Sequence, residues 1–174
     1  VGSFSDISRK LLLQSSIDIE GFVRNDLAMR LAMAIDLAAI AGTGSSNQPT
    51  GILATTGIGA KTFAAIGNPT FGEMVDVESQ VSVDNALFGS LAYVSTAAMA
   101  GAMKQKAKDA GSGQFVMANN QVNGYNMAVT NQMTANTVVF GNFADLIIGM
   151  WGGLDINVDT STGSSSGTVR VVCL

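Results

Sequence analysis

The chain has 174 residues, of which 47% are hydrophobic and 13% are charged, and 20 residues are glycine. It carries 9 basic and 13 acidic residues, which gives a net charge of −4, and it contains no histidine. This composition excludes a disordered chain, histidine-dependent catalysis and a basic stripe for nucleic acid, and no apolar run reaches the roughly 20 residues of a membrane-spanning helix.

Two helices are predicted in the first 41 residues. Ser8–Gln14 predicts a short helix in which the leucines at 11–13 form one broad apolar side. A longer helix is predicted over about 17–41, because apolar residues recur there at steps of three and four. Its expected end signals are Ser16 as N-cap, Asp18 and Glu20 in the first turn, and Gly42 and Gly44 after the last turn. Such a helix is roughly 36 Å long, which suits a scaffold that crosses a domain.

The next segment is predicted to be a connector, a loop and a helix. Gly42–Gly51 is rich in turn-forming residues and is the best candidate for a domain boundary. Ile52–Thr62 has room for a short strand, but its glycines at 57 and 59 favour a loop. Phe71–Asp84 is predicted to be helical, because its apolar residues fall at helical steps.

A strand and another helix follow. Leu91–Val94 predicts a short buried strand, after which Ser95 or Thr96 caps a helix that runs to about Lys108 and is closed by Gly111. Three lysines at the end of this helix suit the negative end of its dipole: Lys104, Lys106 and Lys108. A basic binding patch is the alternative interpretation of these lysines.

From residue 115 onward the pattern changes to strands, so the sequence predicts an α+β fold. Tyr125–Thr130 begins directly after Asn123-Gly124, a strong turn signal. Alternation over 154–158 predicts a half-buried strand with Leu154, Ile156 and Val158 facing inward. The remaining expected strands are Phe115–Met117, Val138–Phe140, Leu146–Trp151 and Thr168–Leu174, with a flexible loop over Thr160–Gly167. Because the last strand has no polar end, we expect the chain to be part of a longer protein.

Two phosphate-binding motifs are incomplete. Residues 59–62 resemble the end of a P-loop, but Thr55 and Ala60 stand where that loop needs glycine. Gly42 and Gly44 follow a helix rather than a strand and lack the third glycine of a dinucleotide-binding motif. The sequence therefore identifies no cofactor-binding residue.

The candidate metal and catalytic motifs are incomplete as well. Asp155, Asn157 and Asp159 begin like a calcium loop, but Thr160 and Ser166 replace its glycine and glutamate. Residues 159–161 resemble the aspartic-protease triplet, but Thr162 stands where a small residue is usual. Cys173 has no histidine partner and lies in an apolar strand, so we expect a small core residue. No metal-binding or catalytic residue is identified.

The order of motifs resembles that of the major capsid proteins of tailed bacteriophages with the Hong Kong 97-type fold. The long helix is followed by Gly42–Gly44 (Gly-Thr-Gly) and by Gln48–Leu53 (Gln-Pro-Thr-Gly-Ile-Leu). Further along come Gly124-Tyr125, Phe140–Phe143 (Phe-Gly-Asn-Phe) and Trp151–Leu154 (Trp-Gly-Gly-Leu). Each motif is weak alone, but their order over nearly the whole chain is fairly specific.

The resemblance implies a long spine helix, a peripheral (P) domain and an axial (A) domain. Residues 1–50 are then expected in the P domain, 51–142 in the A domain, and 143–174 in strands that return to the P domain. The implied function is structural rather than enzymatic: a phage or prophage major capsid (head) protein that self-assembles into an icosahedral shell enclosing DNA. The same fold also builds protein nanocompartments.

The implied partners are copies of the protein itself, in pentamers and hexamers, together with scaffold, portal and decoration proteins. No membrane and no sequence-specific nucleic acid is expected, and the chain opens with no signal-peptide pattern. The implied location is the virion, after assembly in the bacterial host cytoplasm. The family's N-terminal arm, extended loop and last C-terminal strand are expected outside this chain, so no crosslinking residues are transferred.

A small α+β enzyme or ligand-binding domain that uses carboxylates is the alternative function. It requires acidic residues that converge in one pocket, for instance Asp145, Asp155 and Asp159. The low charge content favours the capsid interpretation, because a shell subunit covers much of its surface with neighbouring subunits.

Overall fold

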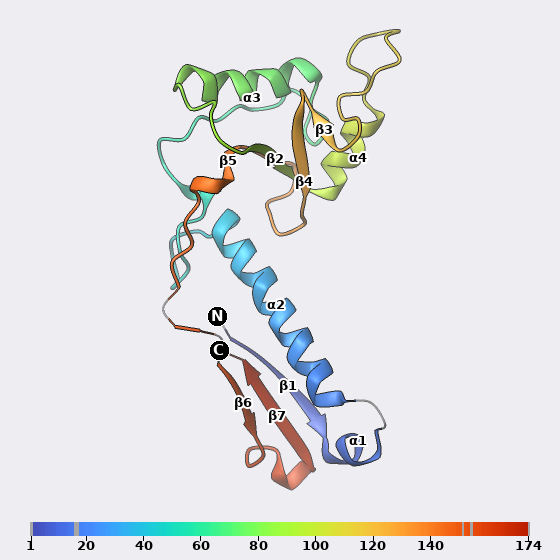
Figure 1. Ribbon diagram of the computed structural model, residues 1–174, viewed down its shortest axis with the longest axis vertical. Helices are drawn as coiled ribbons and strands as arrows, with labels where there is room; N and C mark the ends of the chain where they lie inside the picture. The colour runs from blue at the N-terminus through green and yellow to red at the C-terminus, as the bar shows by residue number, and fades with distance from the viewer. Residues whose placement is uncertain (1, 16–17, 151, 154, 174) are drawn as a thin grey trace. The chain divides into compact units, whose positions relative to one another are not determined.

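The computed structural model describes residues 2–15, 18–150, 152–153 and 155–173, and its contacts divide the chain into two units (Figure 1). Unit 1 comprises residues 1–39 and 149–174, and unit 2 comprises residues 40–148. Each unit has its own sheet and its own hydrophobic core. The predicted α+β class is confirmed.

Unit 1 contains a three-stranded antiparallel sheet with the order β1-β7-β6. β1 spans Ser3–Ser8, β6 spans Ile156–Asp159 and β7 spans Thr168–Cys173. Every second residue of the central strand β7 is buried: Val169, Val171 and Cys173. The opposite side of the strand pair carries a two-pronged ion pair, in which Arg170 Nε and Nη2 lie 2.7 and 2.8 Å from the carboxylate oxygens of Asp6.

Two helices complete unit 1. α1 spans Arg9–Gln14, and α2 spans Ile19–Ala41 and lies along the sheet (Figure 1). The core of the unit forms where Leu27 and Leu31 of α2 meet three sheet residues, Ile7, Val171 and Cys173. The prediction that Cys173 is a core residue is therefore confirmed.

The beginning of α2 differs from the prediction by two residues. The helix begins at Ile19, and the side chain of Asp18 accepts the N–H of Gly21 at 3.0 Å, which is the bond an N-cap makes. The predicted N-cap Ser16 lies outside the described residues. An acidic cap also suits the positive end of the helix dipole.

Unit 2 contains a four-stranded mixed sheet with the order β3-β4-β2-β5. β2 is parallel to β4 and antiparallel to β5, and β3 is antiparallel to β4. The strands are β2 (Leu91–Ser95), β3 (Gln121–Val122), β4 (Tyr125–Val129) and β5 (Val138–Asn142). The helices are α3 (Phe71–Val83) and α4 (Ala97–Gln105), with short 3-10 turns η1 (Ile52–Ala54) and η2 (Phe143–Asp145).

Tyr93 lies at the centre of the core of unit 2. Its ring centroid is 4.3 Å from that of Phe140 and 6.2 Å from that of Tyr125, and its hydroxyl donates to the Met74 carbonyl at 3.1 Å. Burial raises the pKa of Tyr93 well above its ordinary value. The rest of this core is rich in methionine, which fills irregular space well: Met74, Met99, Met103, Met117 and Met127.

Several predicted elements of unit 2 are confirmed to within two residues at each end. These are the helix over 71–84 and the strands over 91–94, 125–130 and 138–140. The predicted turn is confirmed too, since Asn123 and Gly124 both have positive φ, at 50° and 86°. Two consecutive residues with positive φ form the type I′ turn of a tight hairpin.

The prediction that a helix continues to Lys108 is wrong, because α4 ends at Gln105. Beyond that point the Lys106 carbonyl accepts the N–H of Val116, and the Lys108 N–H donates to the Gln114 carbonyl, both at 2.8 Å. These long-range bonds replace the next helical turn. Phe115–Met117 is correspondingly no strand, and Phe115 forms only an isolated bridge with Ala107.

Three differences concern the strands of unit 1 and the segment before them. β1 is not predicted from the sequence. Residues 146–150 of the predicted strand Leu146–Trp151 form no strand, and Trp151 lies outside the described residues. β6 covers only part of the expected 154–158 strand, and Val158 is exposed rather than inward-facing, whereas Leu154 is not described. The 160–167 loop contains a short 3-10 turn, η3 (Ser164–Ser166).

No helix within the described residues is both long and apolar enough to cross a membrane.

Candidate functional site

The acidic residues that the enzyme alternative requires are not gathered in one described pocket. Asp155 directly precedes β6 in unit 1 and Asp159 is the last residue of that strand, so four residues separate them, or roughly 13 Å along a strand. Asp145 belongs to unit 2, where it accepts a hydrogen bond from Asn142 Nδ2 at 2.7 Å. Among the described residues no group of three His, Cys, Asp or Glu side chains is arranged to hold a metal ion.

Asp159 has a structural role in the turn after β6. Its carboxylate accepts the hydroxyl and N–H of Thr162 and the N–H of Ser161, the last at 2.8 Å. These donors, with the Thr162 hydroxyl first, lower the pKa of Asp159 to about 2. The residue therefore stays ionised and fully engaged in its turn, which is unsuited to proton transfer near neutral pH. The triplet 159–161 thus forms a local turn, and of the strand predicted over 154–158 the part from Ile156 to Val158 is confirmed.

The segment with a P-loop resemblance is a loop attached to α3. Lys61 forms an ion pair with Asp76 at 2.8 Å, and Gln80 Nε2 donates to the Ala60 carbonyl at 3.4 Å. The lysine of a P-loop is instead free to meet a phosphate, and its loop opens a helix directly. Here the loop is followed by α3 only at Phe71.

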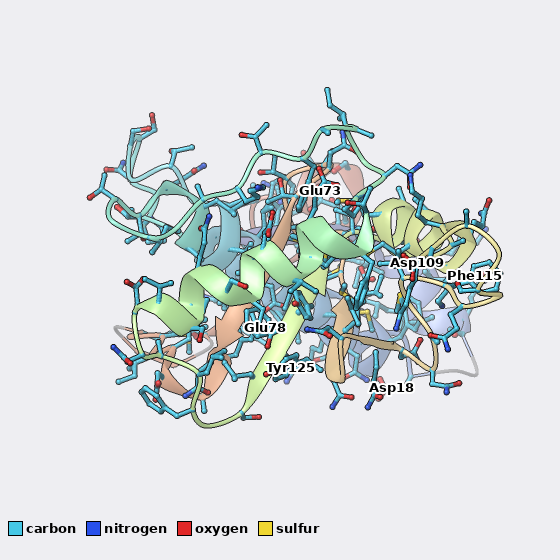
Figure 2. The ribbon with its side chains drawn as sticks, turned by 90° about the horizontal axis from the view of Figure 1, so that it is seen from above. Asp18, Glu73, Glu78, Asp109, Phe115 and Tyr125 are labelled. Carbon is cyan, nitrogen blue, oxygen red and sulfur yellow. The ribbon has the colours of Figure 1, made fainter. Side chains whose placement is uncertain are left out.

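Two carboxylates of α3 bind neighbouring segments of unit 2 (Figure 2). Glu73 accepts the N–H of Ala64 at 2.6 Å and the N–H of Thr70 at 2.7 Å, and these backbone bonds lower the pKa of Glu73. Glu78 points toward Tyr125, whose hydroxyl donates to it at 3.2 Å, and it also accepts from the side chain of Asn123. Glu73 thus holds the loop before α3, and Glu78 holds the β3–β4 hairpin.

Large apolar side chains on the surface are the more informative feature. α1 buries none of its residues, and its three leucines, Leu11–Leu13, are all exposed, with Leu13 86% exposed. Exposed apolar patches of this kind are typical of surfaces that another protein covers.

α2 has a second apolar side in addition to the side that packs on the sheet. The core-facing residues recur every four positions from Val23 to Ile35. A separate stripe of exposed residues recurs at steps of seven, four and four: Phe22, Met29, Met33 and Leu37. We call these four residues the α2 stripe. The ion pair of Asp26 with Arg30, at 2.8 Å, interrupts it, and the exposed Asp36 lies three residues after Met33. A helix with two apolar sides has one side left to cover after its own domain has folded.

Unit 2 also exposes apolar residues. Leu146, Ile147 and Ile148 form a continuous run after η2, and Ile147 is 90% exposed. Ile66, in the loop before α3, is 84% exposed. Sequence periodicity cannot identify such residues, because it indicates which side of an element is apolar and not whether a partner covers it.

The three lysines singled out in the sequence lie in unit 2, but only Lys104 lies in the last turn of α4. Lys108 instead places its Nζ 4.5 Å from the ring centroid of Phe71, at the start of α3. The dipole argument therefore applies to Lys104 alone.

The sequence matches the phage capsid family over residues 1–174. It is similar to the major capsid protein of Halomonas phage phiHAP-1 (isolate -/Gulf of Mexico/-/2001), with 39% identity over 162 residues. That alignment covers 92% of this chain and 26% of the relative.

Solved capsid structures share the fold. The capsid of a native GTA particle, computed with C5 symmetry, matches with a TM-score of 0.74 and 21% identity, over 99% of this chain and 65% of that one. A chain of Microbacterium phage Oxtober96 matches with a TM-score of 0.67 and 13% identity, over 99% and 62% of the two chains. The chain thus spans about a quarter of the curated relative and less than two thirds of these solved chains.

Proposed function

Because the chain belongs to the phage capsid family, we propose that it is part of a major capsid (head) protein of a phage or prophage. The fold is the Hong Kong 97-type capsid fold. The protein self-assembles into an icosahedral shell that encloses DNA, and its role is structural rather than enzymatic.

The observation that carries this proposal is the α2 stripe together with the exposed leucines of α1. Both lie in unit 1. Subunits of a closed shell contact neighbours on several sides, and such contacts are built around apolar side chains with few charges. The same apolar surface on an isolated monomer would favour aggregation.

We assign unit 1 to the P domain and unit 2 to the A domain of such a subunit. The sequence places the crossings after residues 50 and 142, and the contact-based units divide at 39/40 and 148/149. In this assignment α2 is the spine helix, and the connector Gly42–Gly51 leads into the A domain.

The main partner in this proposal is a further copy of the same protein, in pentamers and hexamers. The fivefold symmetry named for the similar GTA capsids supports rings of this kind. Scaffold, portal and decoration proteins are further proposed partners, and the proposed location is the virion after assembly in the host cytoplasm. Neither a membrane nor sequence-specific nucleic acid binding is part of the proposal.

The test is whether the full-length protein that contains this chain forms closed particles. We expect uniform shells by electron microscopy and a rapidly sedimenting species after expression in bacteria. A full-length protein that folds but remains monomeric under all assembly conditions contradicts the proposal.

A substitution in the α2 stripe tests the role of that surface. Met29→Glu places a charge on a residue that is 63% exposed, so the fold should keep its stability to within about 0.5 kcal/mol. Particle yield should nevertheless fall strongly, because the carboxylate would be desolvated in a subunit contact. Met29→Leu, which keeps the side chain apolar, should assemble like the wild type. Equal yields from both variants would show that the stripe stays uncovered.

A further inference from the structure

Unit 2 has few charged groups, and its four basic residues are unevenly placed. Lys61 is neutralised by Asp76 at 2.8 Å. The other three, Lys104, Lys106 and Lys108, lie within five positions at and after the end of α4, and none forms an ion pair with a described residue. We call these three residues the lysine edge. Asp109, which is exposed and follows them directly, is the acidic residue at this edge.

The uncompensated acidic residues of unit 2 lie at the opposite side. Asp84 is the C-cap of α3, and Asp145 follows β5; both are exposed. Asp84 lines a pocket that includes the β5 residue Val139, and Asp145 lines a second pocket that includes the same residue. We call Asp84 and Asp145 the aspartate edge. The remaining acids, Glu73, Asp76 and Glu78, are engaged by the bonds described above.

The length of α3 separates the two edges. Lys108 lies over Phe71, the first residue of α3, and Asp84 caps its other end, 13 helical residues away. That length is roughly 20 Å, about twice the Debye length at physiological salt. The strand order gives the same separation, since the lysine edge leads into β3 and Asp145 follows β5, the two outer strands of the sheet (Figure 1).

The aspartate edge is also an open edge of the sheet. Among the described strands β5 pairs only with β2, so its outer side has no strand partner. An unpaired strand edge is a natural contact for another chain. Because β3 likewise pairs only with β4 among the described strands, both outer sides of the sheet are unpaired, and the sign of the charge is what distinguishes the two edges.

We propose that unit 2 contacts a second copy of itself head-to-tail, with the lysine edge of one copy beside the aspartate edge of the next. This inference rests on the proposed function, and it names the residues that meet between neighbouring subunits of the proposed pentamers and hexamers. Two different patches that meet between identical copies close a ring when the rotation from copy to copy returns to the first copy, whereas a contact of like edges would place equal charges together. The opposed charges thus select the ring contact and reject the face-to-face dimer.

The experiment uses the full-length protein and charge reversals on each edge. The variants are Lys104→Glu with Lys106→Glu, Asp84→Lys with Asp145→Lys, and a swapped variant that combines all four changes. Lys108 is left in place because it packs on Phe71. Circular dichroism of unassembled protein confirms that each variant folds.

We expect each double variant to need a roughly tenfold higher protein concentration for assembly at low salt, because two attractive pairs per contact become repulsive. The swapped variant should return to within about threefold of the wild type, because its opposed edges are restored with reversed sign. The difference between the double variants and the wild type should disappear near 1 M salt, where the Debye length is about 3 Å.

Asp109→Lys is the control, since it reverses one charge at the lysine edge in the favourable direction, half the change that each double variant makes. It should assemble at least as readily as the wild type and remain assembled at higher salt. This inference alone would be overturned if both double variants assembled like the wild type. It would also be overturned if the swapped variant assembled no better than the double variants. A wild-type protein that forms no particles overturns the proposed function and this inference with it.

Discussion

Glu73 joins the start of α3 to the loop before it through one carboxylate. The Thr70 hydroxyl accepts the Glu73 N–H at 3.3 Å while the Glu73 side chain accepts the Thr70 N–H, which is a capping box. The second carboxylate oxygen holds the Ala64 N–H. The residue therefore has two tasks, and only the first is visible in the sequence pattern Thr-x-x-Glu.

Replacing Glu73 by Gln should lower the free energy of unfolding by about 1 kcal/mol at pH 7, because the amide cannot accept from both backbone donors. The folded-state pKa of Glu73 is lowered from its ordinary value of 4.5, so its stabilisation is present above that value and is lost as the pH falls through the folded pKa. Urea unfolding of unassembled wild type and variant should therefore differ at pH 7 and converge once the pH falls below the folded-state pKa of Glu73.

Asp76→Asn is the matched control on the same helix. Asp76 makes a solvent-exposed ion pair with Lys61, and such pairs contribute little to stability. We expect its unfolding free energy to stay within about 0.5 kcal/mol of the wild type. A Glu73→Gln variant as stable as this control would contradict the anchoring role.

At the scale of elements, the connector Gly42–Gly51 folds back on itself, so that its last residues contact the residues at the end of α2. The Gly51 N–H donates to the Gly42 carbonyl at 2.8 Å, and Thr43 and Thr50 form a bridge across the connector. A Cβ at Gly51 would lie 2.5 Å from the Gly42 nitrogen and 2.8 Å from the Ile40 carbonyl oxygen. Because both atoms belong to the backbone, they cannot move aside easily.

Gly51→Ala should therefore destabilise unit 2 by about 2 kcal/mol, the typical cost of overpacking. Gly101→Ala is its control, because Gly101 lies inside α4 with nothing within 4 Å of its added Cβ. That change should stabilise the protein by about 0.5 to 1 kcal/mol through helix propensity. Thermal unfolding of both unassembled variants measures the difference in stability. If the two substitutions changed stability equally, the connector would have to shift to accommodate the added Cβ at residue 51.

At the scale of the whole molecule, the two units have separate cores. Leu27 and Leu31 belong to the core of unit 1, whereas Tyr93 and the buried methionines belong to that of unit 2. Proteins open locally in units that follow such cores. Damage to one core should therefore remain confined to its own unit.

Leu27→Ala removes a buried side chain from unit 1 and should cost about 3 kcal/mol there. In hydrogen exchange of unassembled protein, β1 and β7 should exchange faster while β2 and β4 remain as protected as in the wild type. Met103→Ala, in the core of unit 2, should give the reverse pattern. Faster exchange in both units from either variant would show that they unfold together.

The features that the sequence alone predicts are those that depend on short stretches of neighbouring residues. The helix predicted over 71–84, the Asn123-Gly124 turn and the strand at 168–173 follow from residues close together in the chain, whereas the family follows from the order of motifs along it. Turn chemistry, helical steps and strand alternation all act over a few residues. Composition adds a separate kind of information, because a chain without histidine lacks every catalytic site that depends on this residue.

Only the tertiary structure decided the features that depend on distant partners. β1, with a largely polar sequence, becomes a strand because it pairs with β7 at the other end of the chain, and α4 stops at Gln105 because residues 114–116 take the next hydrogen bonds. Leu146–Ile148 form no strand because an apolar run alone supplies no neighbouring ladder. The exposed apolar side of α2 and the positions of the charged residues of unit 2 likewise depend on the tertiary structure, because the packing of each core determines which side chains remain exposed.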